Sequence, residues 1–235
     1  MENQKKVIAF VVYPEVTPLD LVGPLQVLKP LENFGPFEVV TVGERLEPVT
    51  TDLGMRIVPE RTFADVPRPF ALVLPGGVLG PIQAITNEAL MAYVRSAGAT
   101  AEVLGSVCTG SLILAAAGLL KGQRATTHWS FLDALGRFGA QPVRERWVED
   151  GRAMTAAGVS AGIDMGLALA ARLAGDTVAR SIQAIIEYEP QPPFGMVDWD
   201  WVERVDLKRS LLTPYVPAIQ KILAGRPELL ATLLP

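Results

Sequence analysis

The chain has 235 residues, of which 49% are apolar, and its 21 basic and 25 acidic side chains give a formal net charge of −4. No apolar run approaches the roughly 18–20 residues that cross a membrane, and an acidic chain without a basic block disfavours nucleic acid. We therefore expect a globular, cytoplasmic protein whose partners are a small molecule and a second copy of itself, rather than a membrane or a nucleic acid.

The first apolar run, residues 7–13, is too short for a secretory signal and has no small-residue cleavage site before Pro14. We expect it to be the first buried strand. Beyond it, β-branched apolar runs alternate with helical patterns, which is typical of a parallel sheet covered by helices on both faces. The expected strands are 6–13, 36–43, 70–74, 102–107 and 153–157, with shorter pieces near 55–58, 124–127 and 142–149.

Helical spacing of apolar residues predicts six helices between these strands. They are expected at 21–31, 86–97, 110–117, 130–137, 161–174 and 176–188. The second has the clearest ends, because Thr86 or Asn87 can cap its start and Gly98 can end it.

The prolines at 190, 192 and 193 stop helix formation and mark the end of the compact domain. We expect a catalytic domain over residues 1–195 and a helical extension over residues 196–235. Within the extension, residues 201–212 have the spacing of one amphipathic segment that docks on another surface. That surface belongs either to its own domain or to a second subunit, and Trp199 and Trp201 are candidates for burial there.

Cys108, the only cysteine, follows the apolar run 102–107 and precedes the expected helix at 110–117. N–H groups at a helix start stabilise negative charge, so we expect this position to lower the pKa of the thiol and to bind an anion formed on a substrate. A free cysteine is often only a small buried apolar residue. The strand-turn-helix context favours a nucleophile instead.

Two other loops follow expected strands and should reach the same edge of the sheet. Gly76 and Gly77 allow the backbone to present N–H groups to a ligand, as in an oxyanion hole, although the pair can also form a plain tight turn. Asp20 lies among apolar neighbours, where burial raises the pKa of a carboxyl group and permits proton transfer near neutrality. Its alternative role is to cap the helix that follows.

His128, the only histidine, could be the general base of a Cys/His pair with Cys108. A structural role is more common for a lone histidine, and it is the one we expect. One cysteine and one histidine cannot build an ordinary zinc cluster, so neither a metal nor another cofactor is expected.

The three loops, in this order, resemble the DJ-1/PfpI superfamily over residues 6–195, and within it the isonitrile hydratases. The resemblance implies a flavodoxin-like three-layer α/β sandwich, like that of class I glutamine amidotransferases, and a homodimer. It is carried by the motifs LDLVGP (19–24), LPGG (74–77), SVCTGS (106–111), AGLL (117–120), ATTHW (125–129), AGID (161–164) and Glu187-Tyr188 before Pro192-Pro193-Phe194.

The resemblance further implies an enzyme that hydrates an isocyanide to an N-substituted formamide through a cysteine thioimidate, without a cofactor. Cys108 would be its nucleophile, Asp20 its general acid and base, and Thr109 a neighbour of the site. The amides of Gly77 and Thr109 would receive negative charge, with Gly76 beside them.

His128 and Val159 are expected to pack around these residues without contacting the substrate. Residues 156–159 contain fewer glycines than the same stretch in relatives. The resemblance therefore leaves open how the following helix approaches Cys108. Protease-like members of the superfamily carry histidine directly after the cysteine, where this chain has Thr109, so their base is missing.

Three other functions compete with hydration. The first is ligand sensing, as in the amino-terminal half of AraC-type transcription activators, but about forty residues after the domain are too few for paired helix-turn-helix modules and contain no basic recognition helix. The second is redox sensing by Cys108, which a thiolate favours. The third is a glyoxalase-like activity within the superfamily.

Overall fold

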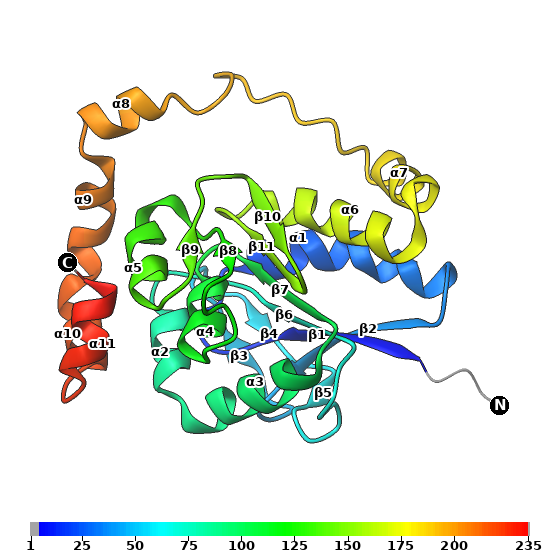
Figure 1. Cartoon of the computed structure of the whole chain (residues 1–235), viewed down its shortest axis with the longest axis horizontal. Helices are drawn as coiled ribbons and strands as arrows, with labels where there is room; N and C mark the ends of the chain where they lie inside the picture. Colours follow the sequence, from blue (N-terminus) through cyan, green and yellow to red (C-terminus); the bar gives the residue numbers. More distant parts are fainter. Residues whose placement is uncertain (1–4, 235) are drawn as a thin grey trace.

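The computed structural model describes residues 5–234, in which a seven-stranded sheet lies between two layers of helices (Figure 1). The strand order is β10-β11-β7-β6-β1-β2-β5, and only the pairing of β10 with β11 is antiparallel. The expected three-layer α/β sandwich is confirmed. The strands are β1 (Lys6–Val11), β2 (Phe37–Gly43), β5 (Arg61–Thr62), β6 (Ala71–Leu74), β7 (Val103–Val107), β10 (Trp147–Asp150) and β11 (Ala153–Ala156).

Four further short strands form two small sheets, β3 (Val49–Thr50) with β4 (Arg56–Ile57) and β8 (Arg124–Ala125) with β9 (Gln141–Pro142). The expected strand at 142–149 is therefore divided between β9 and β10. Within residues 5–234, no helix combines the length and the apolar character that a membrane crossing needs.

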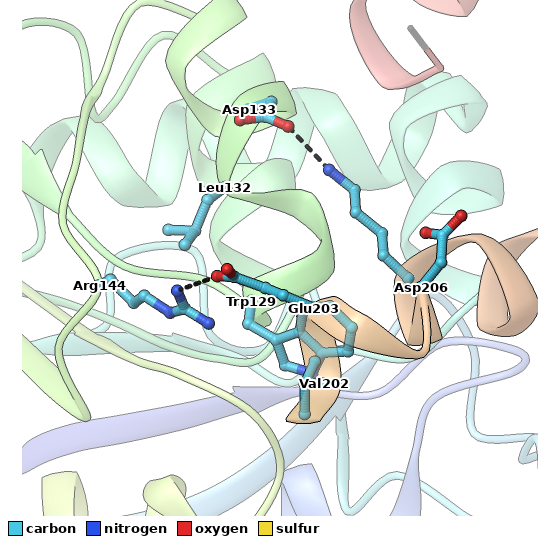
Figure 2. Close-up of a pocket in the computed structure, with 8 residues that line it drawn as sticks. Trp129, Leu132, Asp133, Arg144, Val202, Glu203 and Asp206 are labelled. Carbon is cyan, nitrogen blue, oxygen red and sulfur yellow. Dashed lines mark hydrogen bonds and ion pairs between the residues drawn. The ribbon is translucent and has the colours of Figure 1, made fainter. Parts of the chain in front are cut away.

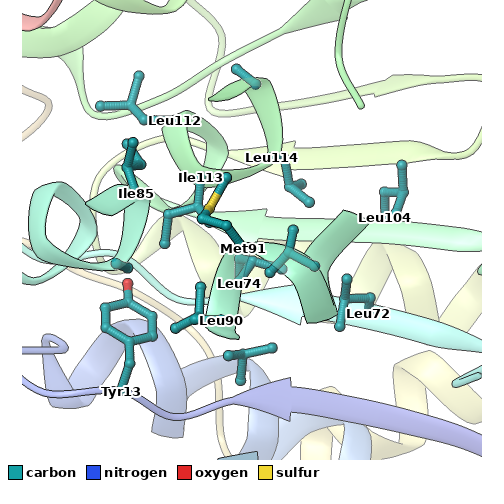
Figure 3. Close-up of a cluster of buried hydrophobic side chains, with 14 of the residues drawn as sticks. Tyr13, Leu72, Leu74, Ile85, Leu90, Met91, Leu104, Leu112, Ile113 and Leu114 are labelled. Carbon is teal, nitrogen blue, oxygen red and sulfur yellow. The ribbon is translucent and has the colours of Figure 1, made fainter. Parts of the chain in front are cut away.

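One face of the sheet is covered by α1 (Pro18–Leu28), α6 (Ala161–Ala174) and α7 (Asp176–Ile185). The other face is covered by α2 (Gly80–Thr86), α3 (Glu88–Thr100), α4 (Gly110–Ala116) and α5 (Leu132–Arg137). Figure 3 shows the core under this second layer, where leucines of β6 and β7 meet side chains of α3 and α4.

Several helix ends differ from the expected bounds, and two of them matter for the site and the caps. The first helix begins at Pro18, whose fixed φ suits the first helical position, so Asp20 lies inside the first turn. Asn87 caps α3 as expected, accepting a bond from the Leu90 amide at 3.0 Å. Gly98, however, does not end α3, because the helix continues to Thr100 and Gly98 is buried inside it. The helix α2 was not expected.

The extension consists of four short helices, α8 (Trp199–Arg204), α9 (Leu207–Leu212), α10 (Val216–Ile222) and α11 (Pro227–Leu233). The single amphipathic segment expected over 201–212 is wrong, since Asp206 has φ 46° and breaks it into α8 and α9. Ile219, Leu223 and Leu233 are buried in the same core as α2 to α5, so the extension packs against its own body.

The register of the parallel strands places the carboxyl ends of β1, β6, β7 and β11 at one edge of the sheet. Phe10 lies opposite Val73, Leu74 opposite Ser106, and Val107 opposite Ala156. The four loops that follow these strands are thereby brought together, as expected for ligand sites in such sheets.

Ile219→Ala should lower the free energy of unfolding of the whole chain by about 2–5 kcal/mol, because it removes a fully buried side chain that joins α10 to the main core. Urea unfolding followed by far-UV circular dichroism measures this, with the exposed Val205→Ala as the control. An early, separate transition for the extension, with the main midpoint unchanged, would contradict a shared core.

Candidate active site

Cys108 lies at the sharp corner between β7 and α4, in the left-handed region with φ 55°. Non-glycine residues adopt this region only when their surroundings hold them there. The Cys108 amide donates to the carbonyls of Ala156 and Ala157, at 3.1 and 2.9 Å. Its carbonyl accepts from the hydroxyls of Ser111 and Thr127, at 3.2 and 3.0 Å. The strained corner is thus fixed by bonds on both sides of the peptide unit.

Two glycines allow the loops to approach this corner. A Cβ atom on Gly110 would lie 2.0 Å from the Leu74 carbonyl oxygen. A Cβ atom on Gly76 would lie 2.6 Å from the Thr109 nitrogen and 2.9 Å from Oδ2 of Asp20. Since these contacts are with backbone or with the acid itself, a larger residue at either position would push the site apart.

The carboxyl group of Asp20 is fully buried in the first turn of α1. Its Oδ2 accepts from the Gly76 amide at 3.1 Å, whereas its Oδ1 has no partner among the described residues. Burial raises the pKa of Asp20 from 3.8 to about 7, although bonds from Cys108 and Gly76 oppose this rise. The pKa of Asp20 therefore lies near neutrality, and Asp20 does not cap α1, whose N-cap residue is Thr17.

Cys108 is also buried, with 6% of its surface exposed. Burial and then the charge of Asp20 raise the pKa of the thiol above its ordinary value, while the amides of Thr109 and Val159 lower it. The expected lowering of the pKa is wrong, since α4 has only seven residues and lies beside a carboxylate in a dry site. The thiol therefore stays protonated near neutrality, which does not favour redox sensing by an exposed thiolate.

The amides of Gly76 and Gly77 are bonded to side chains of the site in this structure. The Gly76 amide is bonded to Asp20, and the Gly77 amide donates to Oγ1 of Thr109 at 3.0 Å. That hydroxyl donates in turn to the Gly77 carbonyl at 2.5 Å and lies 3.9 Å from Sγ of Cys108. Neither glycine amide is free to hold an oxyanion here, because both are bonded to the side chains that flank the sulfur.

The N–H groups that face Sγ belong to Thr109 and Val159. Val159 has φ 34°, a strained conformation for a β-branched residue, directly before α6. The expectation that Val159 lies behind the site underestimates its part, because its amide reaches the sulfur itself.

His128 does not pair with Cys108 in any hydrogen bond among residues 5–234. Its Nδ1 lies 2.7 Å from Oγ of Ser130 and accepts from the Ser130 amide at 3.4 Å. Burial lowers the pKa of His128 to about 4, so the ring is neutral near pH 7. Its neighbour is Gly158, where a Cβ atom would come within 2.9 Å of the ring. The arrangement is that of a structural histidine.

Tyr13 belongs to the site but was not expected there. Its buried hydroxyl donates to the Pro75 carbonyl at 2.5 Å. Its pKa is raised by burial and then by the charges of Asp20 and Cys108. The phenol therefore stays protonated and fixes the loop that carries Gly76. The sequence signal that could have identified Tyr13 is its position just after β1, at the edge of the sheet where the other loops meet.

A separate cavity of about 390 Å³ lies between α5 and the extension (Figure 2). Lys208 reaches across it to Asp133 at 2.7 Å, and Arg144 reaches Glu203 at 3.5 Å. None of the residues that line this cavity belongs to the Cys108 loop. Both ion pairs link the extension to the body at the surface.

Known proteins provide an independent comparison. A family model described as the DJ-1/PfpI family matches residues 5–172. An isonitrile hydratase from Pseudomonas putida is 44% identical over 188 residues, which are 80% of each chain. The HTH-type transcriptional regulator CdhR of Pseudomonas aeruginosa is 34% identical over 134 residues, 56% of this chain and 39% of that protein.

Among solved structures, a ThiJ/PfpI family protein from Pseudomonas syringae superimposes with a TM-score of 0.84 at 38% identity. The match covers 94% of this chain and 91% of that one. Because 94% of 235 residues exceeds the 195 residues before the extension, the match includes at least part of the extension.

The stability of the chain should fall as pH rises from about 4 to 7 in a way that depends on Asp20. In this window the unfolded chain has lost the Asp20 proton, at its ordinary pKa of 3.8, whereas the folded chain keeps it up to about 7. The folded state binds more protons, so raising the pH destabilises it until the folded pKa is passed.

Asp20→Asn removes this pH-dependent contribution to stability. The free energy of unfolding of the variant relative to the parent should therefore rise between about pH 4 and 7 and stay constant above pH 7. Urea unfolding of both proteins at several pH values measures the difference. Parallel stability curves for parent and variant would contradict a raised pKa at Asp20.

Proposed function

The chain belongs to the DJ-1/PfpI family, and from this premise we propose that it hydrates an organic isocyanide, R–N≡C, to the formamide R–NH–CHO. The observation that carries the proposal is the buried pair of Cys108 with Asp20, whose pKa of about 7 suits both donating and accepting a proton. The 44% identity with an isonitrile hydratase over 80% of both chains supports the same substrate class.

In the first step, the sulfur of Cys108 bonds to the terminal carbon of the isocyanide. The proton shared by the pair passes through Asp20 to the same carbon, which gives the thioimidate R–N=CH–S–Cys. Atoms and charges balance, because the thiol S–H is added across one carbon. The free oxygen Oδ1 of Asp20 is the one available for this transfer.

In the second step, the Asp20 carboxylate takes a proton from water while the water oxygen bonds to the thioimidate carbon. Asp20 passes that proton to the nitrogen. As the C–S bond breaks with its electron pair going to sulfur, the C=O bond forms and the hydroxyl proton of the intermediate returns through Asp20 to the thiolate. The amides of Thr109 and Val159 receive that negative charge before the thiol is reprotonated. The products are the formamide and the starting pair, so water is the only co-reactant.

Ligand sensing is the second candidate, and the 34% identity with a transcriptional regulator over 134 residues favours it. In that function a small molecule would occupy the Cys108 site without turnover. Tight binding of an isocyanide with no formamide released, together with a salt-sensitive shift of duplex DNA, would support it over hydration.

Formamide production from cyclohexyl and p-nitrophenyl isocyanide tests the proposal. Cys108→Ala should abolish turnover, and Asp20→Asn should reduce it at least about 100-fold while the fold is kept, because the proton carrier is lost. Asp65→Asn, a surface carboxylate bonded only to Thr62 and outside the site, is the matched control.

Parent-like turnover by Asp20→Asn would refute the acid–base role. Turnover of methylglyoxal but of neither isocyanide would refute hydration and favour a glyoxalase-like activity.

A further inference from the structure

The loop between β11 and α6, residues 157–160, carries the Val159 amide that faces the sulfur of Cys108. Val159 is held at φ 34°, which a β-branched residue adopts only when its surroundings impose it. If Val159 relaxed to negative φ, the peptide plane that carries its N–H would turn away from the sulfur. The contacts that hold this loop therefore decide whether the amide stays in place.

The position of the Val159 peptide depends on where α6 begins. The carbonyls of Gly158 and Val159 accept from the first two amides of α6, at 3.1 and 3.2 Å. On its other side, the loop follows β11, whose register with β7 is fixed by the sheet. A displacement of the first turn of α6 relative to the sheet would thus move the amide, although the sheet and Cys108 stay where they are.

Arg146, just before β10, joins that first turn to the sheet. Its carbonyl accepts from the Ala157 amide at 2.9 Å, which extends the antiparallel ladder of β10 and β11 by one bond. Its guanidinium donates from Nε to Oδ2 of Asp164 at 2.5 Å and from Nη2 to Oγ of Ser160 at 3.2 Å. One residue thus holds both ends of the loop 157–160.

The carboxylate of Asp164 is fixed independently of Arg146. The hydroxyl of Tyr188 lies 3.1 and 3.2 Å from its two oxygens. Asp164 also lies in the first turn of α6, where negative charge is favourable. The guanidinium therefore meets an acceptor that is already in place. The motifs AGID (161–164) and Glu187-Tyr188, to which the proposed reaction gives no part, meet at Arg146.

The exposure of this ion pair argues against a mainly stabilising role. The Arg146 side chain is 51% exposed, and pairs with this exposure contribute little to the stability of a whole chain. Met165 and Leu169, which are fully buried, already anchor α6 in the core. Loss of the pair would leave the helix folded but would release its first turn.

We propose that Arg146 is a positioning residue, which holds the first turn of α6 against β10 and so keeps the Val159 amide on the sulfur of Cys108. The proposal deepens the proposed function, and its catalytic consequence rests on that function. The amide receives charge when the C–S bond breaks, so its displacement slows this step and leaves substrate binding unchanged.

Hydrogen exchange of the Val159 amide, followed by heteronuclear NMR, tests the proposal without turnover. In Arg146→Met this amide should exchange at least about 10-fold faster than in the parent, because the loop opens locally. The urea midpoint of unfolding should stay that of the parent. Arg172→Met is the matched control, since Arg172 pairs with Glu149 at 3.0 Å and joins the other end of α6 to β10. It should leave the exchange at Val159 unchanged.

Formamide production provides the second readout. Arg146→Met should lower kcat about 10-fold at an unchanged KM, because complete loss of such a donor costs about 100-fold or more and the released loop still presents the amide part of the time. Arg146→Lys keeps the charge opposite Asp164 but lacks the planar fork that also reaches Ser160. It should lie between the parent and Arg146→Met in both readouts.

Parent-like exchange at Val159 in Arg146→Met would overturn the proposal, and so would faster exchange with an unchanged kcat. If Arg146→Met does not fold, Asp164→Ala removes the partner of the guanidinium and is judged by the same two results. If the parent releases no formamide from any isocyanide, the proposed function fails, and the exchange at Val159 alone decides whether Arg146 holds the amide.

Discussion

The removal of water from a thiol and a carboxyl that lie side by side is the constraint on which the chemistry of this protein depends. Burial disfavours the charged form of both groups, so Asp20 keeps its proton up to about pH 7 and the Cys108 thiol stays protonated at neutrality. A solvated pair would ionise at the carboxyl and leave the thiol to titrate alone. In the proposed reaction, the buried carboxyl supplies a proton where the substrate arrives, and the sulfur becomes nucleophilic as its own proton leaves.

Keeping this pair together requires an unusual backbone. Cys108 and Val159 both adopt positive φ, and each directs a polar group toward the sulfur region. Gly76 leaves room for the carboxylate of Asp20 at a distance that no Cβ atom would permit. The strained Cys108 is held by hydrogen bonds with Ala156, Ala157, Ser111 and Thr127. The loops around it meet because four parallel strands end at one edge.

Much of this arrangement could be predicted from the sequence. Alternating apolar patterns located the principal strands within a few residues, and the rule that parallel strands end together brought Asp20, Gly76 and Cys108 to one place. The predicted lowering of the pKa of the Cys108 thiol was wrong. Sequence spacing reveals a helix start, but not the burial or the neighbouring charge that outweighs its effect. The bonds that the Gly76 and Gly77 amides make to Asp20 and Thr109 could not be predicted for a similar reason, since the partners of backbone amides depend on tertiary geometry. The place of Tyr13 is likewise set by a contact between distant segments, its bond to the Pro75 carbonyl.

Covalent capture of the isocyanide carbon by Cys108 is the central claim, and rapid quenching followed by peptide mass spectrometry tests it most directly. With p-nitrophenyl isocyanide and the parent protein, the account predicts that the peptide containing Cys108 transiently gains the mass of one intact isocyanide molecule, at a rate no slower than formamide release. Formamide release with no such adduct at any quench time, and undiminished release by Cys108→Ala, would contradict it.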